Sequence, residues 1–518
     1  LAPSLARDWP DAGAIAGLDE AAERVARAVR ERERVIVFGD FDLDGVSAAG
    51  LLTLALRSFG GKAGAVVPHR VNEGYGLSQA AIERVLAKRP DLVVTVDCGV
   101  SSAAEVDALR AAGVDVVVTD HHEPGDGLPT GVPVADPKFA ADGPELSGAG
   151  VALALVKAVG ELLGDGSAWL EYLDLATLGT VADIVPLLGP NRALVAAGLE
   201  RMRTCPRPGV RALAEVAGIE VGQVTSERVA FALGPRLNAA GRMADAVLAL
   251  RLLMTEDADE ARSIASTLDE HNRSRQVVEL SVFKQAMELI EADGGPEPPL
   301  IVVAGEGWHD GVRGIVASRL AQRFGIPALV LCVEDGVAVG SGRSVPGLDL
   351  HGALSEVRGM LDRFGGHEAA VGFALPAERL GEFRNAAKEA LAPAFAALPP
   401  RATLVDGAIA LGDVDIASAA DLDLLEPFGF GNPRPVFAFA GVRLDQCRPV
   451  GPTGQHAVMQ VLDGASGIEA IMFRCPDIAG LERLGTADLI AAVERSTWRG
   501  RERVRLLVQE VLEPRAAR

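Results

Sequence analysis

The sequence RVIVFGDFDLDG at residues 34–45 decides the fold of this chain. Residues 35–38 are continuously apolar, which is typical of a strand that is buried on both faces of a sheet. Three aspartates follow at every second position, and Gly45 then lets the backbone turn toward a helix expected from about Val46 to Phe59. A buried strand that ends in carboxylates and leads into a helix predicts the first βα unit of a parallel sheet.

The same alternation of short apolar runs and helical stretches continues to about residue 200. A helix is expected at residues 20–33, and further strands are expected at residues 63–67, 92–96, 114–119 and 132–135. Continuous apolar strands separated by helices predict an α/β fold whose parallel sheet is covered on both faces. Residues 145–290 are mainly helical, and they include a long helix expected to run from an N-cap at Thr255 to about Ala292.

Changes in composition and in the pattern of expected helices and strands divide the chain into several parts. A chain of 518 residues is too long for one ordinary core. The Gly/Pro-rich residues 294–299 form the clearest linker, and short strands and turns follow residue 400. We therefore expect a catalytic α/β domain with a helical C-terminal part at 1–254, a connecting helix at 255–293, a smaller α/β domain at 294–398 and a β-barrel-like domain at 399–518. In the smaller domain, strands are expected at 300–304, 328–332 and 338–341.

Composition excludes several classes of protein. Hydrophobic residues make up 49% of the chain, but no apolar run approaches the roughly 18 residues that a membrane helix needs. Residues 1–4 do not resemble a secretory signal. The five cysteines are scattered without a C-x-x-C pair, which argues against a disulfide framework or a cysteine zinc site and favours a reducing cytoplasm.

The formal charge of −21 predicts solubility and does not decide what one cleft binds. Arginines cluster at Arg201, Arg203, Arg207 and Arg211, and again at Arg236 and Arg242. Two readings remain open for these clusters. They are either solvated faces or a local basic groove, and DNA binding in such a groove falls steeply with salt.

Acidic and imidazole side chains follow three predicted strands. They are Asp40, Asp42 and Asp44 after residues 35–38, Asp97 after residues 92–96, and Asp120, His121 and His122 after residues 114–119. The carboxyl ends of parallel strands line one crevice, so these groups are expected to converge in space. From an extended backbone Asp42 and Asp44 would point the same way. Oxygen and nitrogen donors of this kind suit two hard divalent cations that share one bridging carboxylate.

Other interpretations of these residues do not require a two-metal site. An EF-hand loop shares the D-x-D-x-D-G pattern, but here a strand precedes it and the twelfth position is Leu51 rather than Glu. The aspartates could instead cap the following helix. A histidine pair is usually inert, and because His121 and His122 are adjacent their roles should differ. Asp183 lies in the apolar segment 179–186, where a charge is costly unless it is paired or metal-bound, although it could cap a helix end.

These motifs together resemble the DHH phosphoesterase superfamily and, within it, the RecJ family of bacterial single-strand-specific exonucleases. Residues 39–45 match the family motif GDYDADG with Phe for Tyr and Leu for Ala, and every carboxylate is kept. Further matches are residues 73–77, 96–99, 119–122, 179–186 and the family-specific stretch 234–242. The resemblance covers nearly the whole chain and implies a DHH domain, a DHHA1 domain with motifs at 307–309, 340–343 and 365–367, and an OB-fold domain entered at 425–433.

The resemblance implies a 5′→3′ exonuclease that releases mononucleotides from single-stranded DNA by two-metal hydrolysis, in DNA repair and recombination. The implied metal ligands are Asp40, Asp42, Asp44, Asp97, His121 and Asp183. Asp97 would bridge the two ions, and Asp40 could instead orient a ligand. His122 is expected to contact phosphate or transfer a proton, and Asp120 to orient a histidine. Mixed Asp and His ligation favours Mn²⁺, with Mg²⁺ also allowed.

The resemblance also implies contacts to the substrate. The residues concerned are Asn238, Arg242, His309, Ser341, Gly342, Arg343, Gly366 and His367. Arg242 and Arg343 would grip phosphate oxygens, and the glycines would permit close approach of the backbone to a phosphate. Phe437 and Phe439 alternate on one face of an expected barrel strand. We expect both side chains to pack in the barrel core rather than to stack on nucleic-acid bases. Single-strand-binding protein and a RecQ-type helicase are the implied protein partners.

Other functions fit part of this pattern. An oligoribonuclease or a cyclic-dinucleotide phosphodiesterase of the superfamily would share the chemistry, but such relatives generally lack the extension after Pro400. A catalytically inactive nucleic-acid-binding scaffold would have lost metal ligands, and here the ligand set is complete. An inorganic pyrophosphatase would not need the C-terminal module.

Overall fold

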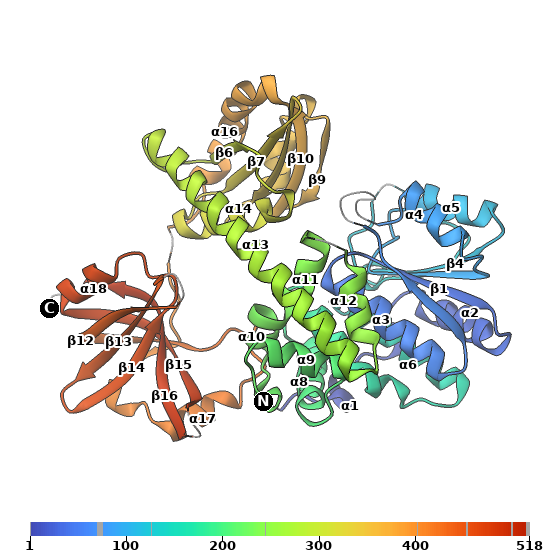
Figure 1. The fold of residues 1–518 in the computed structure, drawn as a ribbon, viewed down its shortest axis with the longest axis horizontal. Helices are drawn as coiled ribbons and strands as arrows, with labels where there is room; N and C mark the ends of the chain where they lie inside the picture. Colours follow the sequence, from blue (N-terminus) through green and yellow to red (C-terminus); the bar gives the residue numbers. More distant parts are fainter. Residues whose placement is uncertain are drawn as a thin grey trace.

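The computed structural model describes residues 2–69, 76–125, 127–243, 245–400, 402–451, 454–498 and 501–513. Three sheet-containing regions surround a bundle of helices, and one long helix runs from that bundle to the second sheet (Figure 1). A short helix, α1 (Leu5–Asp8), precedes the first region. Within the described ranges, no helix combines the length and apolar character needed to cross a membrane.

The first sheet is parallel throughout, as the sequence predicts. Its strands follow the order β2-β1-β3-β4-β5, with β1 at Arg34–Gly39, β2 at Lys62–Val66, β3 at Leu92–Val96, β4 at Asp115–Thr119 and β5 at Val134–Ala135. Alternate side chains of β1 enter two separate cores, so both faces of the sheet are covered. One core contains α2 (Leu18–Arg30), α3 (Leu43–Ser58), α6 (Gly148–Leu163) and α7 (Leu173–Ala182), and the other contains α4 (Gln79–Leu86) and α5 (Ala103–Ala111).

A helical bundle follows the sheet. Its members are α8 (Gly189–Thr204), α9 (Pro208–Val216), α10 (Ser226–Arg228), the π-helical turn η5 (Val229–Leu233), α11 (Gly234–Met243) and α12 (Val247–Met254). The long helix α13 (Ala258–Ala292) begins two residues later than expected. Asp257 caps it by accepting hydrogen bonds from the N–H groups of Asp259 and Glu260, whereas the Thr255 hydroxyl donates to the Glu260 carboxylate. The predicted N-cap at Thr255 is therefore wrong.

The second sheet is mixed. Its order is β6-β7-β8-β10-β9, and only the β6–β7 pair is parallel. The strands are β6 (Ile301–Glu306), β7 (Ala328–Glu334), β8 (Val337–Arg343), β9 (Arg363–His367) and β10 (Ala370–Pro376). The C-terminal half of α13 and α14 (Arg313–Phe324) cover one face, and α15 (Leu350–Ser355) and α16 (Leu380–Ala396) cover the other.

The C-terminal region is a closed five-stranded barrel, which confirms the expected OB-like module. Its strands are β12 (Val436–Val450), β13 (His456–Asp463), β14 (Ser466–Met472), β16 (Arg501–Leu512) and β15 (Thr486–Trp498), and β12 pairs with β15 to close the circle. The short β11 (Gly407–Ala408) pairs with β12, and α17 (Ile416–Asp423) and α18 (Ile478–Leu484) flank the barrel. Phe439 is buried in the barrel core and Phe437 packs against it, so the core reading holds for both.

The segment that enters the barrel is anchored to the helical bundle. The carbonyl oxygen of Phe430 accepts the N–H of Leu187 at 2.7 Å, and the carbonyl oxygen of Phe428 accepts the hydroxyl of Ser226 at 2.6 Å. Arg434 adds an ion pair with Glu227 at 2.8 Å. The barrel is therefore held against the bundle by both backbone and side-chain contacts.

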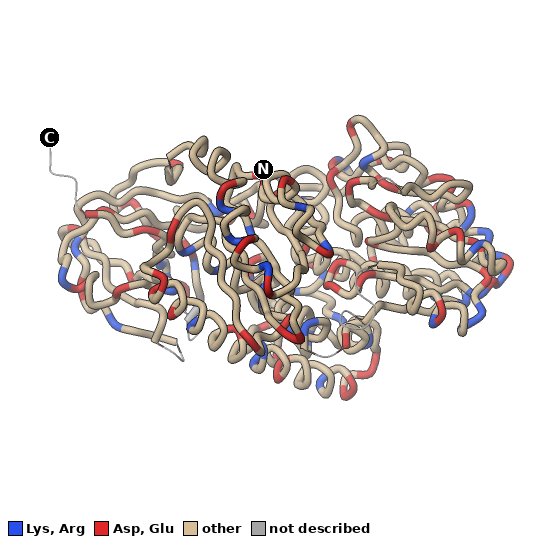
Figure 2. Tube along the Cα trace, turned by 90° about the horizontal axis from the view of Figure 1, so that it is seen from above, with Lys and Arg blue, Asp and Glu red and all other residues tan. Residues whose placement is uncertain are grey.

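Most of the clustered arginines stabilise the fold. Arg207 pairs with buried Asp174 at 2.9 Å and Arg236 with Asp269 at 2.9 Å, while Arg203 donates to the carbonyl oxygen of Val224. Acidic and basic residues are interspersed along the trace rather than segregated (Figure 2). These three arginines are therefore bound to partners within the fold, and their contacts do not support the basic-groove interpretation.

Candidate metal centre

The aspartate motif after β1 turns into a helix earlier than the sequence suggests. Helix α3 begins at Leu43, and Asp42 caps it by accepting hydrogen bonds from the N–H groups of Asp44 and Gly45 at 3.0 and 3.1 Å. The expected extended backbone through Asp44 is therefore wrong, and the capping alternative holds for Asp42. As a result Asp42 is exposed while Asp44 points inward from the first turn and is buried.

Asp44 is held by the N-terminus of another helix. Its Oδ2 accepts the N–H of Gly148 at 2.7 Å and its Oδ1 accepts the N–H of Ala149 at 3.0 Å, both from the first turn of α6. Burial, followed by the negative charge of Asp42, raises the pKa of Asp44 to about 7. The two hydrogen bonds favour the ionised form but only partly offset the burial.

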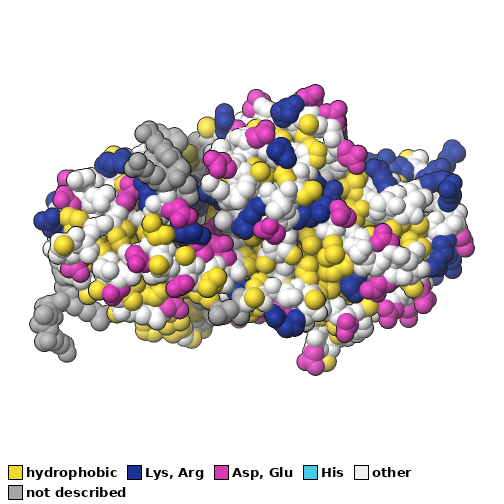
Figure 3. Space-filling model, turned by 90° about the horizontal axis from the view of Figure 1, so that it is seen from below, with side chains coloured by type: hydrophobic (Ala, Val, Ile, Leu, Met, Phe, Trp, Pro, Cys, Tyr) yellow, Lys and Arg dark blue, Asp and Glu magenta, His cyan; other side chains and the backbone are white. Residues whose placement is uncertain are grey.

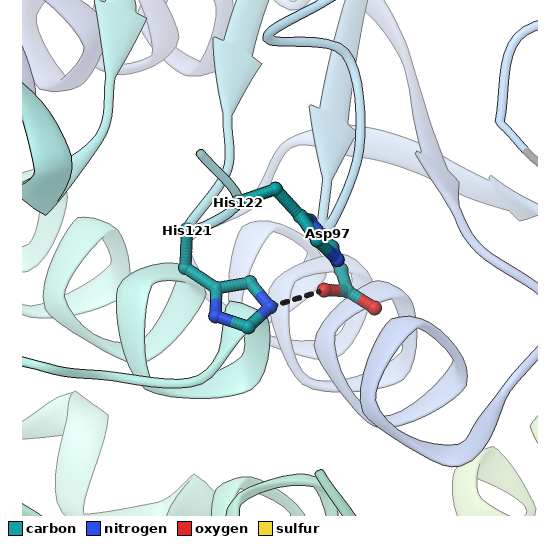
Figure 4. Close-up of side chains that lie close together, drawn as sticks. All are labelled: Asp97, His121 and His122. Atoms are coloured by element: carbon teal, nitrogen blue, oxygen red, sulfur yellow. Dashed lines mark ion pairs between the residues drawn. The ribbon is translucent and has the colours of Figure 1, made fainter. Parts of the chain in front are cut away.

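Asp97 lies at the carboxyl end of β3 in the left-handed region, with φ of 61°. Asp97 is only 3% exposed, and its Oδ1 lies 3.0 Å from the Nε2 of His121. Figure 4 shows the imidazole of His121 directed at this carboxylate. Among the described residues, neither of these two buried atoms has a hydrogen-bond partner of acceptable geometry. Burial, and then the charges of Asp44 and Asp42, hold the pKa of Asp97 well above its usual value.

The two adjacent histidines have different environments, as their adjacency predicts. Asp120 accepts hydrogen bonds from the backbone of Val100 and His121, and its Oδ1 lies 2.7 Å from the Nδ1 of His122. Burial is the largest single effect and lowers the pKa of His122, but the hydrogen bond and charge of Asp120, with the charges of Asp183 and Asp42, together raise that pKa to about 9. Burial likewise raises the pKa of Asp120, and the contact with His122 and the backbone hydrogen bonds together lower it. Burial, aided by the charge of His122, lowers the pKa of His121 to about 4. Asp120 thus orients His122 rather than the ring of His121.

Asp183 completes the cluster from the C-terminal end of α7. Its Oδ2 lies 3.8 Å from the Nε2 of His121, and burial followed by the charge of Asp44 raises its pKa to about 8. Two groups of possible ligand atoms, each within 4.8 Å of one another, share His121. The first contains Asp44, His121 and Asp183, and the second contains Asp97, His121 and His122.

These residues fit divalent cations. Buried carboxylates with raised pKa values and a buried imidazole nitrogen without a hydrogen bond are unfavourable unless a cation compensates them. The donors are the hard oxygens and imidazole nitrogens that Mn²⁺ and Mg²⁺ accept. Asp40 is buried beside them, where its Oδ1 accepts the N–H of Gly76 at 3.4 Å, and burial and Asp42 raise its pKa to about 7.

Two motifs of the second sheet meet across β10. Residue pairing aligns Arg343 with Ala370 and Ala370 with His367, so Arg343 and His367 flank the same residue. The same register brings Gly342 and Gly366 to either side of Val371. The sequence does not predict β9 and β10, which are the strands that create this alignment.

Packing within the second domain explains why glycine occupies positions 342 and 366. A Cβ atom at Gly342 would crowd Val371, Leu329 and Leu350 in the core. Gly366 has a φ of 137°, and a Cβ there would collide with the carbonyl oxygen of Ala370. Tight packing thus accounts for both glycines, and their approach to a phosphate stays a prediction.

Of the remaining expected substrate contacts, Arg242 and His309 meet at Gly311, where the first and second regions touch. The Oδ1 of Asn238 accepts the N–H of Leu43, which ties α11 to the aspartate motif. Arg242 donates to the carbonyl oxygen of Gly311 at 3.1 Å, and the Nδ1 of His309 accepts the N–H of Gly311. A Cβ atom at Gly314 in α14 would lie 2.8 Å from a guanidinium nitrogen of Arg343, and Ser341 is two residues away on the same strand face. Residues 73–75 of the expected second motif lie outside the described residues.

Sequence reasoning missed Asp136. This residue follows β5 as Asp97 follows β3, and it is fully buried with an unpartnered Oδ2 among the described atoms. Burial is the main cause that raises its pKa to about 7, while its hydrogen bond from the N–H of Lys138 acts in the opposite direction. The rule that located the other carboxylates, the carboxyl end of a parallel strand, would also have located this one.

Comparison with known proteins gives concordant matches. Family models match residues 34–180 (DHH family, N-terminal domain), 297–392 (DHHA1 domain) and 405–510 (RecJ OB domain). The chain is 36% identical to the single-stranded-DNA-specific exonuclease RecJ of Dickeya dadantii, over 96% of this chain and 90% of the relative. It is 34% identical to the Bacillus subtilis protein of the same name, over 97% of this chain and 64% of the relative's length. The crystal structure of RecJ in complex with Mn²⁺ from Thermus thermophilus matches with a TM-score of 0.83 and 33% identity, over 98% of this chain and 74% of that one.

Proposed function

The chain belongs to the RecJ family of single-stranded-DNA-specific exonucleases, and from that premise we propose that it removes mononucleotides from the 5′ end of single-stranded DNA by metal-dependent hydrolysis. One observation carries this proposal. Asp44, Asp97, His121 and Asp183 come from four separate segments and bring possible ligand atoms together at one edge of the sheet. Two of these buried atoms, the Oδ1 of Asp97 and the Nε2 of His121, have no hydrogen-bond partner among the described residues. A purely structural cluster would pair these atoms internally.

We assign the metal ligands as follows. Asp44, His121, Asp183 and Asp97 would hold one ion, and Asp97 would bridge to a second ion held with Asp42 and Asp40. Bound divalent ions lower the pKa of a coordinated water and stabilise negative charge on the phosphate and the leaving oxygen. The carboxylates of Asp44 and Asp97 are already fixed, by α6 and by the backbone at the end of β3, so they would need little reorganisation on binding.

The remaining side chains position the substrate. His122 carries a proton near neutral pH because of Asp120, and it would donate from Nε2 to a phosphate or leaving oxygen. Asp120 is a positioning residue, since it acts through His122. Arg343, with Ser341 and His367 nearby in the sheet register, would bind a phosphate from the facing domain, with Arg242 and His309 at the contact between the two domains.

Digestion of end-labelled oligonucleotides tests the proposal. Single-stranded DNA labelled at the 5′ or the 3′ end is incubated with Mn²⁺ or Mg²⁺, beside duplex DNA and RNA of the same sequence. We expect 5′-mononucleotides from single-stranded DNA, and no product from the Asp97→Ala variant. Activity confined to short RNA or cyclic dinucleotides would instead favour the related phosphodiesterases. A wild-type protein that binds DNA without metal-dependent cleavage would leave an inactive scaffold.

We also propose that the chain works in a reducing cytoplasm beside single-strand-binding protein and a RecQ-type helicase. Its five cysteines are unpaired, which agrees with a reducing compartment. Co-purification of each purified partner with the chain, in the absence of DNA, tests these two contacts.

A further inference from the structure

A group of exposed basic side chains lies at the amino-terminal ends of the strands of the first sheet. We call this group the basic patch, and its members are Arg34, Arg57, Lys62, Lys88 and Arg89. Strand β1 runs over six residues from Arg34 to Gly39, and the aspartate motif follows Gly39. At about 3.3 Å per residue, the patch therefore lies roughly 20 Å from that motif, at the opposite end of the sheet from the metal centre.

Strand pairing and hydrogen bonds bring these five residues together. Parallel pairing of β1 with β2 places Arg34 beside Lys62. The guanidinium group of Arg34 donates to the carbonyl oxygens of Lys88 and Arg89, at 2.9 and 3.2 Å. Arg57 donates to the carbonyl oxygen of the residue after Lys62, at 2.8 Å. Because these hydrogen bonds go to neutral carbonyl groups, they leave the charges of both guanidinium groups uncompensated.

The lysines of the chain differ in whether they have a carboxylate partner. The chain has six lysines. Four of them form an ion pair with a glutamate: Lys138 with Glu123, Lys157 with Glu161, Lys284 with Glu288 and Lys388 with Glu297. The other two are Lys62 and Lys88, and within the described part of the chain neither forms such a pair. Both lysines without a carboxylate partner thus belong to the basic patch.

The positive charge of the patch exceeds the negative charge around it. Asp91 contacts the patch by accepting the N–H of Arg34 at 2.7 Å. The neighbouring Glu33 and Asp115 already pair with Arg24, each at 2.8 Å. Helices α2, α3 and α4 end here, and each helix end contributes roughly half a negative charge. After Asp91 and the three helix ends are counted, an excess of about two and a half positive charges remains. The formal charge of the whole chain, in contrast, is −21.

A hollow of about 380 Å³ lies between the basic side chains. Arg34, Arg57 and Lys62 line it, together with small residues that include Gly61 and Gly64. Strand β2 forms this edge of the described sheet, so its outer side is open to a ligand. On the face seen in Figure 3, Lys and Arg side chains gather at the right-hand end, where Figure 1 places the first sheet and its helices.

The chemistry of this surface suits the phosphate backbone of a nucleic acid. Cations without carboxylate partners attract a polyanion, and a guanidinium group binds two phosphate oxygens at once. None of the described residues that line the hollow is aromatic, so the hollow offers no ring on which a base could stack. Binding should therefore depend on phosphate charge and salt and not on the base sequence.

We propose that the basic patch binds the phosphate backbone of a second segment of DNA, separate from the strand whose 5′ end lies at the metal centre. The choice of DNA as the polyanion rests on the proposed exonuclease function. Because the two sites lie at opposite ends of the same strands, a short oligonucleotide occupies only one of them. A long substrate that occupies both is held more tightly, since the second contact forms within one complex. The patch thus retains long DNA between successive cleavages.

Lysine acetylation in EDTA tests the patch without cleavage. Wild-type protein is treated with acetic anhydride alone, with long single-stranded DNA, with duplex DNA, or with poly-L-glutamate of the same total charge, and mass spectrometry reports the acetylation of each lysine. We expect DNA to reduce the acetylation of Lys62 and Lys88 severalfold and to leave Lys388 of the second domain unchanged. This protection supports the patch even if the protein cuts no DNA. Its absence overturns the patch even if the protein is an active nuclease, and equal protection by poly-L-glutamate overturns the assignment to nucleic acid.

The double variant Lys62→Gln with Lys88→Gln measures the contribution of the patch to DNA binding. Lys388→Gln is the matched control, and none of these lysines belongs to a hydrophobic core. Loss of two phosphate contacts should reduce the slope of log affinity against log salt by about 1.4 for a long single strand, and should lower its affinity at moderate salt roughly tenfold. The kcat on a short strand should equal that of wild type. A wild-type salt slope in the double variant, or an equal loss of affinity for short and long strands, overturns the proposal.

Discussion

Gly148 lies directly against the side chain of Asp97, so that a Cβ atom at position 148 would collide with the Asp97 carboxylate. The N–H of the same glycine donates to Asp44 at 2.7 Å. One residue at the start of α6 therefore sets the separation of two carboxylates that follow different strands, β1 and β3.

Replacement of Gly148 should disable the metal centre. In Gly148→Ala the added methyl displaces Asp97 or moves α6 away from Asp44, and misplacement of catalytic groups by about 1 Å can lower a rate by roughly a hundredfold. We expect at least that loss in nuclease rate together with weaker Mn²⁺ binding by calorimetry. Gly222→Ala is the matched control, since no atom lies within 4 Å of its added Cβ. Unchanged Mn²⁺ affinity in Gly148→Ala would contradict the assigned ligand set.

The metal-free protein should lose stability as the pH rises from about 4 to about 8. The pKa values of Asp44 and Asp183 are raised to about 7 and about 8. A carboxyl whose pKa is raised by folding stabilises the folded state fully below its ordinary pKa, and this contribution is lost as the pH rises through the folded value. Melting temperatures in EDTA should fall over this range, and those in Mn²⁺ should fall less. The Asp183→Asn variant should show a shallower fall in EDTA, and an identical slope would refute the assignment for Asp183.

Metal binding should release protons for the same reason. The ligands must be ionised to bind a cation, so Mn²⁺ affinity should increase between pH 6 and pH 8. Calorimetric titrations in two buffers of different ionisation enthalpy count the protons released. A Mn²⁺ affinity that does not change with pH would mean that the bound ion is held by groups that are already ionised.

Removal of the Asp120 carboxylate should lower the pKa of His122. The hydrogen bond between them holds that pKa at about 9, and Asp120→Asn removes the negative charge. Nuclear magnetic resonance of ¹⁵N-histidine-labelled protein in EDTA can follow the eight histidines of the chain. We expect the imidazole assigned by its loss in His122→Ala to titrate nearer its ordinary value in Asp120→Asn. The kcat of that variant should fall at alkaline pH more than at acidic pH.

Arg343 should contribute to substrate affinity and not to metal binding. Loss of one phosphate contact to a single strand reduces the slope of log affinity against log salt by about 0.7. Arg343→Ala should therefore raise KM for single-stranded DNA and reduce this slope, with Mn²⁺ affinity unchanged. Arg363→Ala is the control, because Arg363 lies on the same sheet and pairs with Ala374 rather than Ala370. A variant whose salt slope equals that of wild type would remove Arg343 from the phosphate site.

The sequence predicts the parallel sheet and the convergence of its ligands because both follow from one rule. Polar groups at the carboxyl ends of parallel strands meet, whatever their distance along the chain. Asp44, Asp97 and His121 obey this rule and were predicted from it. Asp136 obeys it too and was overlooked, so that omission was not a limit of the sequence.

Other features depend on competition that the sequence does not resolve. Asp257 and Thr255 are both good N-caps, and contact of Thr255 with Glu260 leaves Asp257 to cap α13. The motif at residues 40–45 can be extended or helical. The helical form is favoured because the N–H groups of Asp44 and Gly45 donate hydrogen bonds to the side chain of Asp42, which caps the helix. The left-handed backbone at Ile184 is imposed by tertiary packing, because nothing in an isoleucine favours it.

Helix α13 fixes the second domain relative to the first, because it packs into a core of each. Its N-terminal residues Ala261 and Leu268 belong to the first core and its C-terminal residues Val282 and Ile290 to another, so one rigid rod of roughly 50 Å is embedded in both. Arg319 clamps it to α14 through Glu279 at 3.0 Å and through the ring of Phe283. The position of Arg343 relative to Asp97 is thus set by the number of residues in this helix. One residue inserted in the middle of α13 would rotate the second domain by about 100° around the helix axis and move Arg343 relative to Asp97.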